Sequence, residues 1–309
     1  MKKFLFTFST FPARIHYILL LAGGHLTFSI GFCQLPDTDI WLLNMKKKDS
    51  TYLVSDPVNI TNRLGYDNQP CFHPDGSYLL YTSVREDGQA DIYKFDIKTK
   101  TTTPFCKTPE SEYSPTFTPE RKFVSVVRVE KDSAQRLWKF PIAGGDPILL
   151  TKDIDSIGYH CWLNPDSLVF FILTQPFTLQ LASLSSQKTT VISDSIGKSL
   201  VRFRYMRSAG ALFIRSVRGK NMVCFTTLQM SKKNKFYVEE IMPLPEGCEY
   251  FCFYNNTLFC AKGGKVFKSE MMKDNTWILL GDLSTNGITN ITRLAVSPDG
   301  QRIAIVNSK

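Results

Sequence analysis

Residues 69–83, QPCFHPDGSYLLYTS, contain two short apolar segments joined by a Pro-Asp-Gly turn. Residues 294–308, LAVSPDGQRIAIVNS, repeat this pattern close to the end of the 309-residue chain. Pro and Asp favour the entry to a turn, and Gly76 and Gly300 suit a turn position that needs a positive φ. Each stretch therefore predicts a β-hairpin. The turn itself explains its aspartate, so neither a catalytic nor a calcium-binding role is inferred for it.

Further hairpin patterns lie between these two stretches. They turn at Pro119, around Asn164, around Arg207 and at Asn255-Asn256, so a new hairpin begins roughly every 40–50 residues. After each of the first three hairpins come two further strand-like segments, as in residues 89–105, QADIYKFDIKTKTTTPF. No window shows a sustained 3.6-residue apolar repeat, so little helix is expected. Four strands per unit at this period are typical of a β-propeller.

The two ends of the chain carry complementary halves of one unit. Residues 37–61 read as the second half of a unit, and residues 291–309 read as the first half. Joined together, they complete a blade and close the ring, which removes the exposed edges of an open sheet. The sequence therefore predicts an all-β fold, a six-bladed β-propeller with four-stranded blades and a composite N-/C-terminal blade.

The motifs of the first unit resemble those of a known family. Residues 72–76, FHPDG, followed by residues 91–93, DIY, resemble the TolB-like, WD-like propeller repeats of bacterial envelope proteins. Residues 39–41, DIW, and residues 297–300, SPDG, fit the two halves of the closing blade in the same way.

This resemblance covers essentially all of residues 34–309, which are expected to form a single propeller domain. It is strong in the first two blades and in the last half-blade. It is weak between about residues 165 and 290, where the Pro-Asp-Gly turn is lost and blade boundaries are not predicted. The resemblance implies a non-catalytic propeller of the cell envelope.

The first 33 residues have the pattern of a secretory signal. Lys2 and Lys3 precede an apolar run, residues 15–32, that contains no acidic residue. Cleavage after Cys33 would release a soluble protein into the periplasm, the envelope or the medium. A lipid anchor at Cys33 and an uncleaved membrane anchor are the alternatives.

The charge of the chain after the signal argues against a nucleic-acid partner. Removing three of the 37 basic residues leaves 34 against 28 acidic residues, a net charge of +6. These charges are scattered along the sequence, and export argues further against nucleic acid. The expected partner is an envelope protein, a peptide or a glycan, bound by a monomer.

Seven cysteines follow the signal, without a zinc-binding spacing. Cys71, Cys161 and Cys252 recur two blades apart. This spacing has two interpretations, a three-thiol metal site or three small side chains packed between blades. A propeller channel is too wide for three such short side chains to share one ion. Buried free thiols are therefore expected, and no metal or other cofactor.

No catalytic motif is present, and neither a G-x-S-x-G elbow nor a following hydrolase domain is found. The main hypothesis is a non-catalytic binding or scaffold module. The alternative is a glycan-active enzyme, a lyase or glycosidase, with Glu112, Asp155 and Glu249 as its available carboxylates. No signature pairs them, so an enzymatic role is not favoured.

Candidate binding residues lie where each unit enters its innermost strand. One set consists of aromatic residues just before that strand or early in it. The second set consists of charged or titratable residues beside them. In the fourth unit, arginines take the place of the tyrosine. The candidates are Tyr66, Asp67, Glu112, Tyr113, Tyr159, His160, Arg202, Arg204 and Tyr250. They predict an aromatic, mixed-charge mouth of the channel that stacks on sugar rings or a peptide. The alternative is that the tyrosines only cap the blade interfaces.

Overall fold

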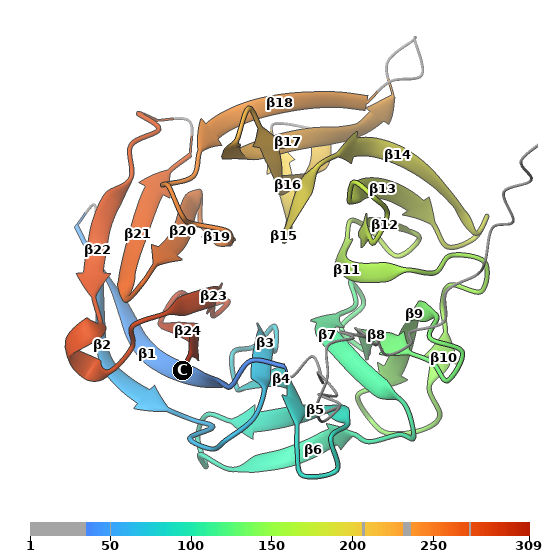
Figure 1. Ribbon diagram of the computed structural model, residues 1–309, viewed down its shortest axis with the longest axis horizontal. Helices are drawn as coiled ribbons and strands as arrows, with labels where there is room; N and C mark the ends of the chain where they lie inside the picture. Colours follow the sequence, from blue (N-terminus) through green and yellow to red (C-terminus); the bar gives the residue numbers. More distant parts are fainter. Residues whose placement is uncertain (1–34, 50, 206–207, 231–235, 272) are drawn as a thin grey trace, which may run out of the picture. The chain divides into compact units, whose positions relative to one another are not determined.

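A ring of six four-stranded antiparallel sheets is formed by the described residues of the computed structural model (Figure 1). These residues are 35–309 except 50, 206–207, 231–235 and 272. The predicted signal, residues 1–33, lies outside them. The arrangement confirms the predicted six-bladed β-propeller.

Five blades are continuous in sequence, and their strands follow one another from the channel outward. The first blade comprises β3 (Asp67–Phe72), β4 (Tyr78–Val84), β5 (Ala90–Asp96) and β6 (Thr102–Cys106). The second comprises β7 (Ser111–Phe117), β8 (Phe123–Val129), β9 (Gln135–Pro141) and β10 (Ile148–Leu149). The third comprises β11 (Ile157–Trp162), β12 (Ser167–Ile172), β13 (Thr178–Ser183) and β14 (Lys188–Asp194).

The region where the repeat is weak in sequence contains the remaining two continuous blades. The fourth comprises β15 (Ile196–Tyr205), β16 (Ser208–Val217), β17 (Lys220–Met230) and β18 (Phe236–Pro243). The fifth comprises β19 (Phe251–Tyr254), β20 (Thr257–Lys262), β21 (Lys265–Glu270) and β22 (Ile278–Asp282). Helical structure in the described residues is limited to a 3-10 turn, Ser284–Asn286.

The composite blade joins the two ends of the propeller. It comprises β23 (Ile291–Val296), β24 (Arg302–Ser308), β1 (Thr38–Lys48) and β2 (Thr51–Asn59), from the channel outward. β24 pairs with β1 in continuous antiparallel register from Thr38 opposite Ser308 to Asn44 opposite Arg302. The C-terminus therefore supplies the two inner strands of a sheet whose outer strands lie near the start of the propeller, as predicted.

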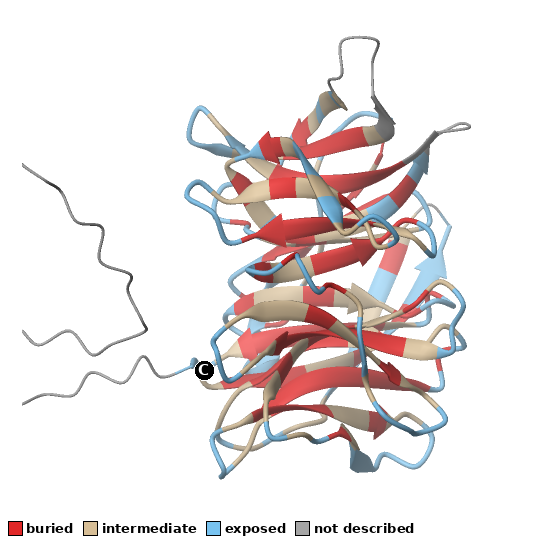
Figure 2. Cartoon of the chain, turned by 90° about the vertical axis from the view of Figure 1, so that its right-hand side faces the viewer, coloured by how far each residue is buried: buried red, intermediate tan, exposed pale blue. Residues whose placement is uncertain are grey.

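The core lies between the blades, because both faces of each middle strand are covered by neighbouring blades. Strand β12, SLVFFI, is buried at every residue after the first, whereas β14 at the outside is largely exposed. Figure 2 shows buried residues along the strands and exposed residues mainly in the loops at their ends. Burial on both faces favours continuous apolar runs over alternation in such strands. The interface between the composite and first blades packs Ile40 and Val306 against Leu79.

Replacing glycine by alanine should lower the stability of the protein by different amounts at the two Pro-Asp-Gly turns. Gly76 has φ +76° and an added Cβ would meet no atom closer than 3.8 Å, so Gly76→Ala should cost about 1–2 kcal/mol from the backbone alone. Gly300 has φ +69°, and its added Cβ would lie 2.5 Å from the Tyr254 hydroxyl oxygen. Chemical denaturation should therefore show a larger loss in the free energy of unfolding for Gly300→Ala than for Gly76→Ala. Equal losses would contradict the packing of Tyr254 on the closing turn.

Candidate functional site

The innermost strands of all six blades border a central cavity of about 390 Å³. Its wall is built from parts of β3, β7, β11, β15, β19 and β23. These strands enter from the same end of the channel, because each blade begins at the centre and continues outward in the same sense (Figure 1). The starts of the six inner strands therefore lie at one end of the channel.

We call the six residues that gather at this end the channel mouth. Each blade provides one of them, either within its inner strand or immediately before it. Four are tyrosines and two are basic residues: Tyr66, Tyr113, Tyr159, Lys198, Tyr250 and Arg293. The structure thus brings together the four tyrosines that the sequence singled out, and adds two cations from the remaining blades.

Local irregularities in the inner strands orient these side chains. The pairing register shifts between Tyr113 and Thr116 in β7, and it shifts between Ile157 and Tyr159 in β11. Equivalent shifts occur in β15 around Lys198 and in β23 next to Arg293. A bulge locally breaks the alternation of faces and redirects a side chain, which explains why residues at these positions turn toward the channel.

Arg293 reaches across the channel. It belongs to the composite blade, yet its Nη2 donates a hydrogen bond of 3.2 Å to the hydroxyl of Tyr159 in the third blade. These blades lie opposite each other in the ring. Its guanidinium carbon lies 5.2 Å from the ring centre of Tyr159 and 4.7 Å from that of Tyr250. The cation is therefore held by two aromatic rings near the axis.

The mouth holds protonated phenols around a charged guanidinium. Burial raises the pKa of Tyr66, and the nearby Tyr159 raises it further. Burial also raises the pKa of Tyr113 and of Tyr250. The pKa of Arg293 is raised as well, because the surrounding tyrosines outweigh the opposing effect of burial. At neutral pH these hydroxyls therefore remain available as hydrogen-bond donors.

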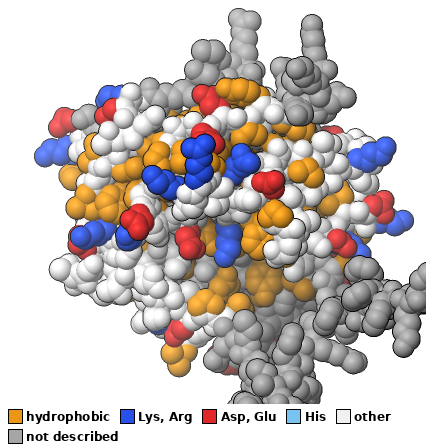
Figure 3. Space-filling model, turned by 45° about the horizontal axis from the view of Figure 1, so that its top comes forward, with side chains coloured by type: hydrophobic (Ala, Val, Ile, Leu, Met, Phe, Trp, Pro, Cys, Tyr) orange, Lys and Arg blue, Asp and Glu red, His pale blue; other side chains and the backbone are white. Residues whose placement is uncertain are grey.

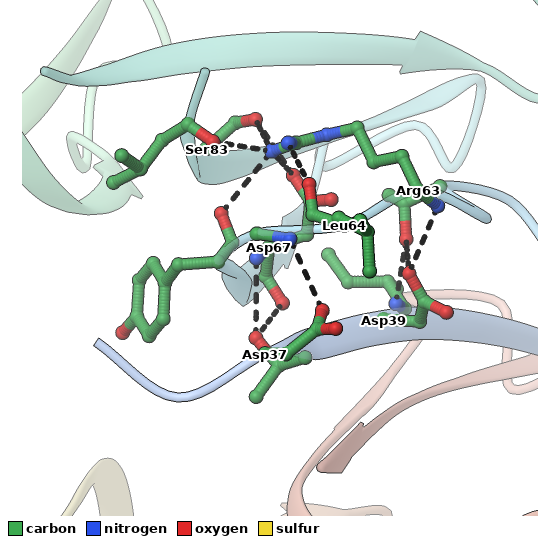
Figure 4. A network of polar contacts seen from close by, with 12 residues as sticks. Asp37, Asp39, Arg63, Leu64, Asp67 and Ser83 are labelled. Atoms are coloured by element: carbon green, nitrogen blue, oxygen red, sulfur yellow. Dashed lines mark hydrogen bonds and ion pairs between the residues drawn. The ribbon is translucent and has the colours of Figure 1, made fainter. Parts of the chain in front are cut away.

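Asp67 is engaged between blades and does not face the mouth. Its fully buried carboxylate lies 2.8 Å from Arg63 Nη2 and accepts a hydrogen bond of 2.6 Å from Ser83 (Figure 4). Its backbone exchanges hydrogen bonds with the Thr38 hydroxyl of the composite blade. Burial raises the pKa of Asp67. This network joins the closing blade to the first blade.

Glu112 is the corresponding buried acid of the second blade. Its Oε1 accepts hydrogen bonds from Arg128 Nε at 3.0 Å and from the Thr108 hydroxyl at 2.6 Å. The side chain of Glu112 has no exposed surface, and burial raises its pKa to about 7. Its contacts place it in the blade interior rather than at the mouth with Tyr113.

His160 lines the central cavity next to Tyr159, but its ring is engaged between two blades. Its Nε2 lies 2.7 Å from the Ser125 hydroxyl of the second blade, which accepts a hydrogen bond from Trp162. Burial lowers the pKa of His160 to about 3, so it is neutral at physiological pH. The three side chains form a polar contact between the second and third blades.

Arg202 and Arg204 are exposed, but the structure does not group them with the tyrosines. They are the seventh and ninth residues of β15, whereas Lys198 is the third. The cavity wall follows β15 from Lys198 to Val201 and does not include either arginine. Within the fourth blade, Lys198 therefore takes the place at the mouth that the sequence analysis gave to Arg202.

The three recurring cysteines lie on β3, β11 and β19, in alternate blades as predicted. Each thiol is near the backbone of the next inner strand: Phe117 for Cys71, Arg202 for Cys161 and Val296 for Cys252. Burial raises the pKa of Cys71 to about 11 and those of the other two to about 12. These contacts show thiols packed between blades. All seven described cysteines are free.

Sequence reasoning missed Lys198 and Arg293, although a signal was present. Tyr159, Lys198 and Arg293 are each the third residue of an inner strand, in the segments IGYHCW, IGKSLV and ITRLAV. Alignment of β7, β11, β15 and β23 by this position, which is Tyr113 in β7, would have identified the two cations. A lysine and an arginine stand at this position in two blades, so a pattern defined by tyrosine does not include them.

Elsewhere, charges of both signs alternate over the surface seen in Figure 3. No single-sign patch dominates that face, which matches the scattered charges of the sequence. Among the described residues, helices of the length and apolarity needed to cross a membrane are absent.

Comparison with known proteins supports the fold. No protein family model matches the sequence, and no curated protein matches it. Among solved structures, a putative TolB from Agrobacterium tumefaciens aligns with a TM-score of 0.66 at 15% identity, over 89% of this chain and 99% of that chain. TolB from Acinetobacter baumannii aligns with a TM-score of 0.53 at 11% identity, over 88% of this chain and 65% of that chain. The chain is thus a TolB-like propeller in fold.

An enzyme shares this architecture. The oligogalacturonate lyase from Vibrio parahaemolyticus aligns with a TM-score of 0.53 at 12% identity, over 83% of each chain. At such identities the likeness concerns the fold, and function has to be argued from the site.

Proposed function

We propose that this protein is an exported, non-catalytic binding module of the cell envelope, which holds a protein, peptide or glycan at the channel mouth. The observation that carries the proposal is the convergence of Tyr66, Tyr113, Tyr159 and Tyr250 from four different blades onto one end of the channel. Aromatic side chains with polar tips are enriched at binding surfaces, because they offer contact area together with hydrogen bonds.

The arrangement suits binding better than structural capping alone. The four tyrosines are only partly buried and border cavities of about 390 and 340 Å³. Tyr159 packs its ring edge-on against Phe171, which fixes its orientation while leaving its hydroxyl at the channel. A rigid aromatic platform loses little conformational entropy when a ligand binds. The basic, acid-free start of the chain supports export.

Replacing Tyr113 and Tyr159 together by alanine should abolish retention of the envelope partner. The partner would be isolated from envelope extract on the immobilised protein, and the double variant compared with wild type. Both side chains are half-buried, so we expect a stability loss on the order of 1 kcal/mol each and a folded variant.

Tyr237→Ala is the matched control, since Tyr237 is 57% exposed on the outer strand β18. It should retain the partner. Equal retention by the double variant would refute the proposed mouth, and unfolding of the double variant would show that the tyrosines are structural. A partner found only in cytoplasmic extract would contradict the envelope location.

The alternative is a glycan-active enzyme, and the observation in its favour is the fold shared with oligogalacturonate lyases. The available carboxylates give it little support. Glu112 is paired with Arg128 inside its blade, whereas Asp155 and Glu249 are exposed in loops. No contact between described residues joins these three into an acid–base pair. Cleavage of a glycan by the purified protein would favour this alternative.

A further inference from the structure

The guanidinium of Arg293 has no acidic partner among the described residues. Its only hydrogen bond there is the one to Tyr159, although an arginine carries five N–H donors. The side chain is half-buried and borders the central cavity. None of its N–H groups is both fully buried and unpaired, so the donors that Tyr159 does not use remain accessible to an anion at the cavity.

A second cation reinforces this charge. Lys198 borders the same cavity as Tyr250 and Arg293. It too forms no ion pair within the described part of the chain. The hydroxyls of Tyr66, Tyr113 and Tyr250, whose pKa values are raised, can donate to an anion. Positive charge, free N–H groups and hydroxyl donors thus meet at one end of the channel.

Glu249 is an acid that shares cavity walls with residues of the mouth. It lines a small cavity together with Tyr250 and Arg293, and another with Lys198, but it is exposed and forms no described ion pair. Its carboxylate would repel an anion bound at the mouth. This gives the site an internal test, because removing the charge of Glu249 should strengthen anion binding.

The wall of the cavity beyond Arg293 is more apolar than polar, although Gln69, Thr116 and His160 also line the cavity. It includes Pro70, Pro115, Leu200 and Val296. The inner strands are also edge strands, since each pairs with a partner on only one side within its sheet. An edge strand offers backbone hydrogen bonds to an extended chain. A sugar would place hydroxyls against these apolar side chains, whereas an apolar amino-acid side chain would fit there.

From these features we propose that the channel mouth captures the C-terminal carboxylate of a peptide, with the apolar side chain of its last residue in the cavity beyond Arg293. The planar carboxylate suits the guanidinium fork, with Lys198 and the tyrosine hydroxyls as further donors. This inference rests on the proposed function and names the chemistry of its ligand.

The test compares two acetylated tetrapeptides of three alanines and a C-terminal leucine, one with a free carboxylate and one with a carboxamide. Isothermal titration calorimetry of the purified protein should show at least about tenfold tighter binding of the free acid. Arg293→Gln should remove this discrimination, and Lys198→Gln should reduce it. Glu249→Gln should tighten binding of the acid by several-fold.

Arg202→Gln is the matched control, because Arg202 is an exposed arginine outside the cavity wall, and it should change nothing. Thermal melting verifies that each variant is folded. Three results would overturn the proposal. The acid and the amide could bind equally well, the Arg293→Gln variant could still prefer the acid, or neither peptide could bind. Tighter binding of glucuronate than of the peptide would assign the site to an acidic sugar instead. If the wild type binds acid and amide equally and the Tyr113/Tyr159 double variant binds neither, the carboxylate site is refuted. The proposed function of the channel mouth is then still supported.

Discussion

Deletion of residues 291–309 is expected to abolish cooperative unfolding and to cause aggregation. The deletion removes β23 and β24, the two inner strands of the composite blade. It leaves β1 without the partner that it pairs with from Thr38 to Asn44. It also uncovers the fully buried Ile40 and Leu43 and the apolar contacts of the first blade. Exposed sheet edges with apolar faces promote association between chains.

Size-exclusion chromatography and calorimetry of the truncated protein provide the measurement. Deletion of Lys309 alone is the control, because this residue is partly exposed and lies beyond β24. Its ion pairs with Asp37 and Asp39 should contribute at most about 1 kcal/mol. A monomeric truncation of residues 291–309 that melts like the full protein would show that ring closure is dispensable.

Arg128→Met should reduce the free energy of unfolding by about 3–5 kcal/mol near pH 8, as expected when one partner of a buried ion pair is removed. Arg128 is buried against Glu112 and Trp138, and its guanidinium carbon lies 4.2 Å from the Trp138 ring centre. Methionine retains part of the apolar contact but leaves the Glu112 carboxylate without its cation. Urea denaturation measures the loss.

The pH dependence of this loss follows from Glu112. Burial raises its pKa from 4.5 to about 7 in the folded protein. Between these values the folded state retains a proton that the unfolded state has released, so stability falls as pH rises through this window. Removing Arg128 raises the pKa of Glu112 further, and the decline should extend above pH 7. The Arg128→Met substitution should therefore be less damaging near pH 5 than near pH 8.

Two further variants separate charge from packing. Arg128→Met combined with Glu112→Gln should recover part of the stability at pH 8, because no buried charge is left unpaired. Arg136→Met is the matched control, since Arg136 pairs with Glu130 on the partly exposed face of the same blade. It should cost about 1 kcal/mol or less. A pH-independent loss equal in both arginine variants would disprove the buried-pair account.

The repeat, the turns and the closing blade could be predicted from the sequence, because they depend on local physical chemistry. Alternation and apolar runs predict strands, and Pro-Asp-Gly predicts a turn that needs a positive φ at glycine. Gly76 and Gly300 have that conformation, and the adjacent Asp75 accepts a hydrogen bond from the Ser77 backbone. The complementary half-units at the two ends were sufficient to predict closure.

The roles of the charged residues beside the tyrosines could not be predicted in this way. Asp67, Glu112 and His160 lie next to mouth positions in sequence, yet each meets a partner inside or between blades. Whether a side chain turns to the channel or to a neighbouring blade depends on bulges in β3, β7 and β11. A bulge interrupts the alternation of faces, so strict alternation does not give the face of the residues around it, and it has no clear signature in these segments.

The sequence by itself thus determined the strands, their order in each blade and the closure of the ring, since these follow from contacts between neighbouring segments. Only the tertiary structure decided that Arg293 and Lys198 share a mouth with the four tyrosines. Arg293 meets Tyr159 across 134 positions of the chain, from the opposite side of the ring. Such a contact depends on the diameter of the channel and on the local bulges, which are set when all six blades pack together.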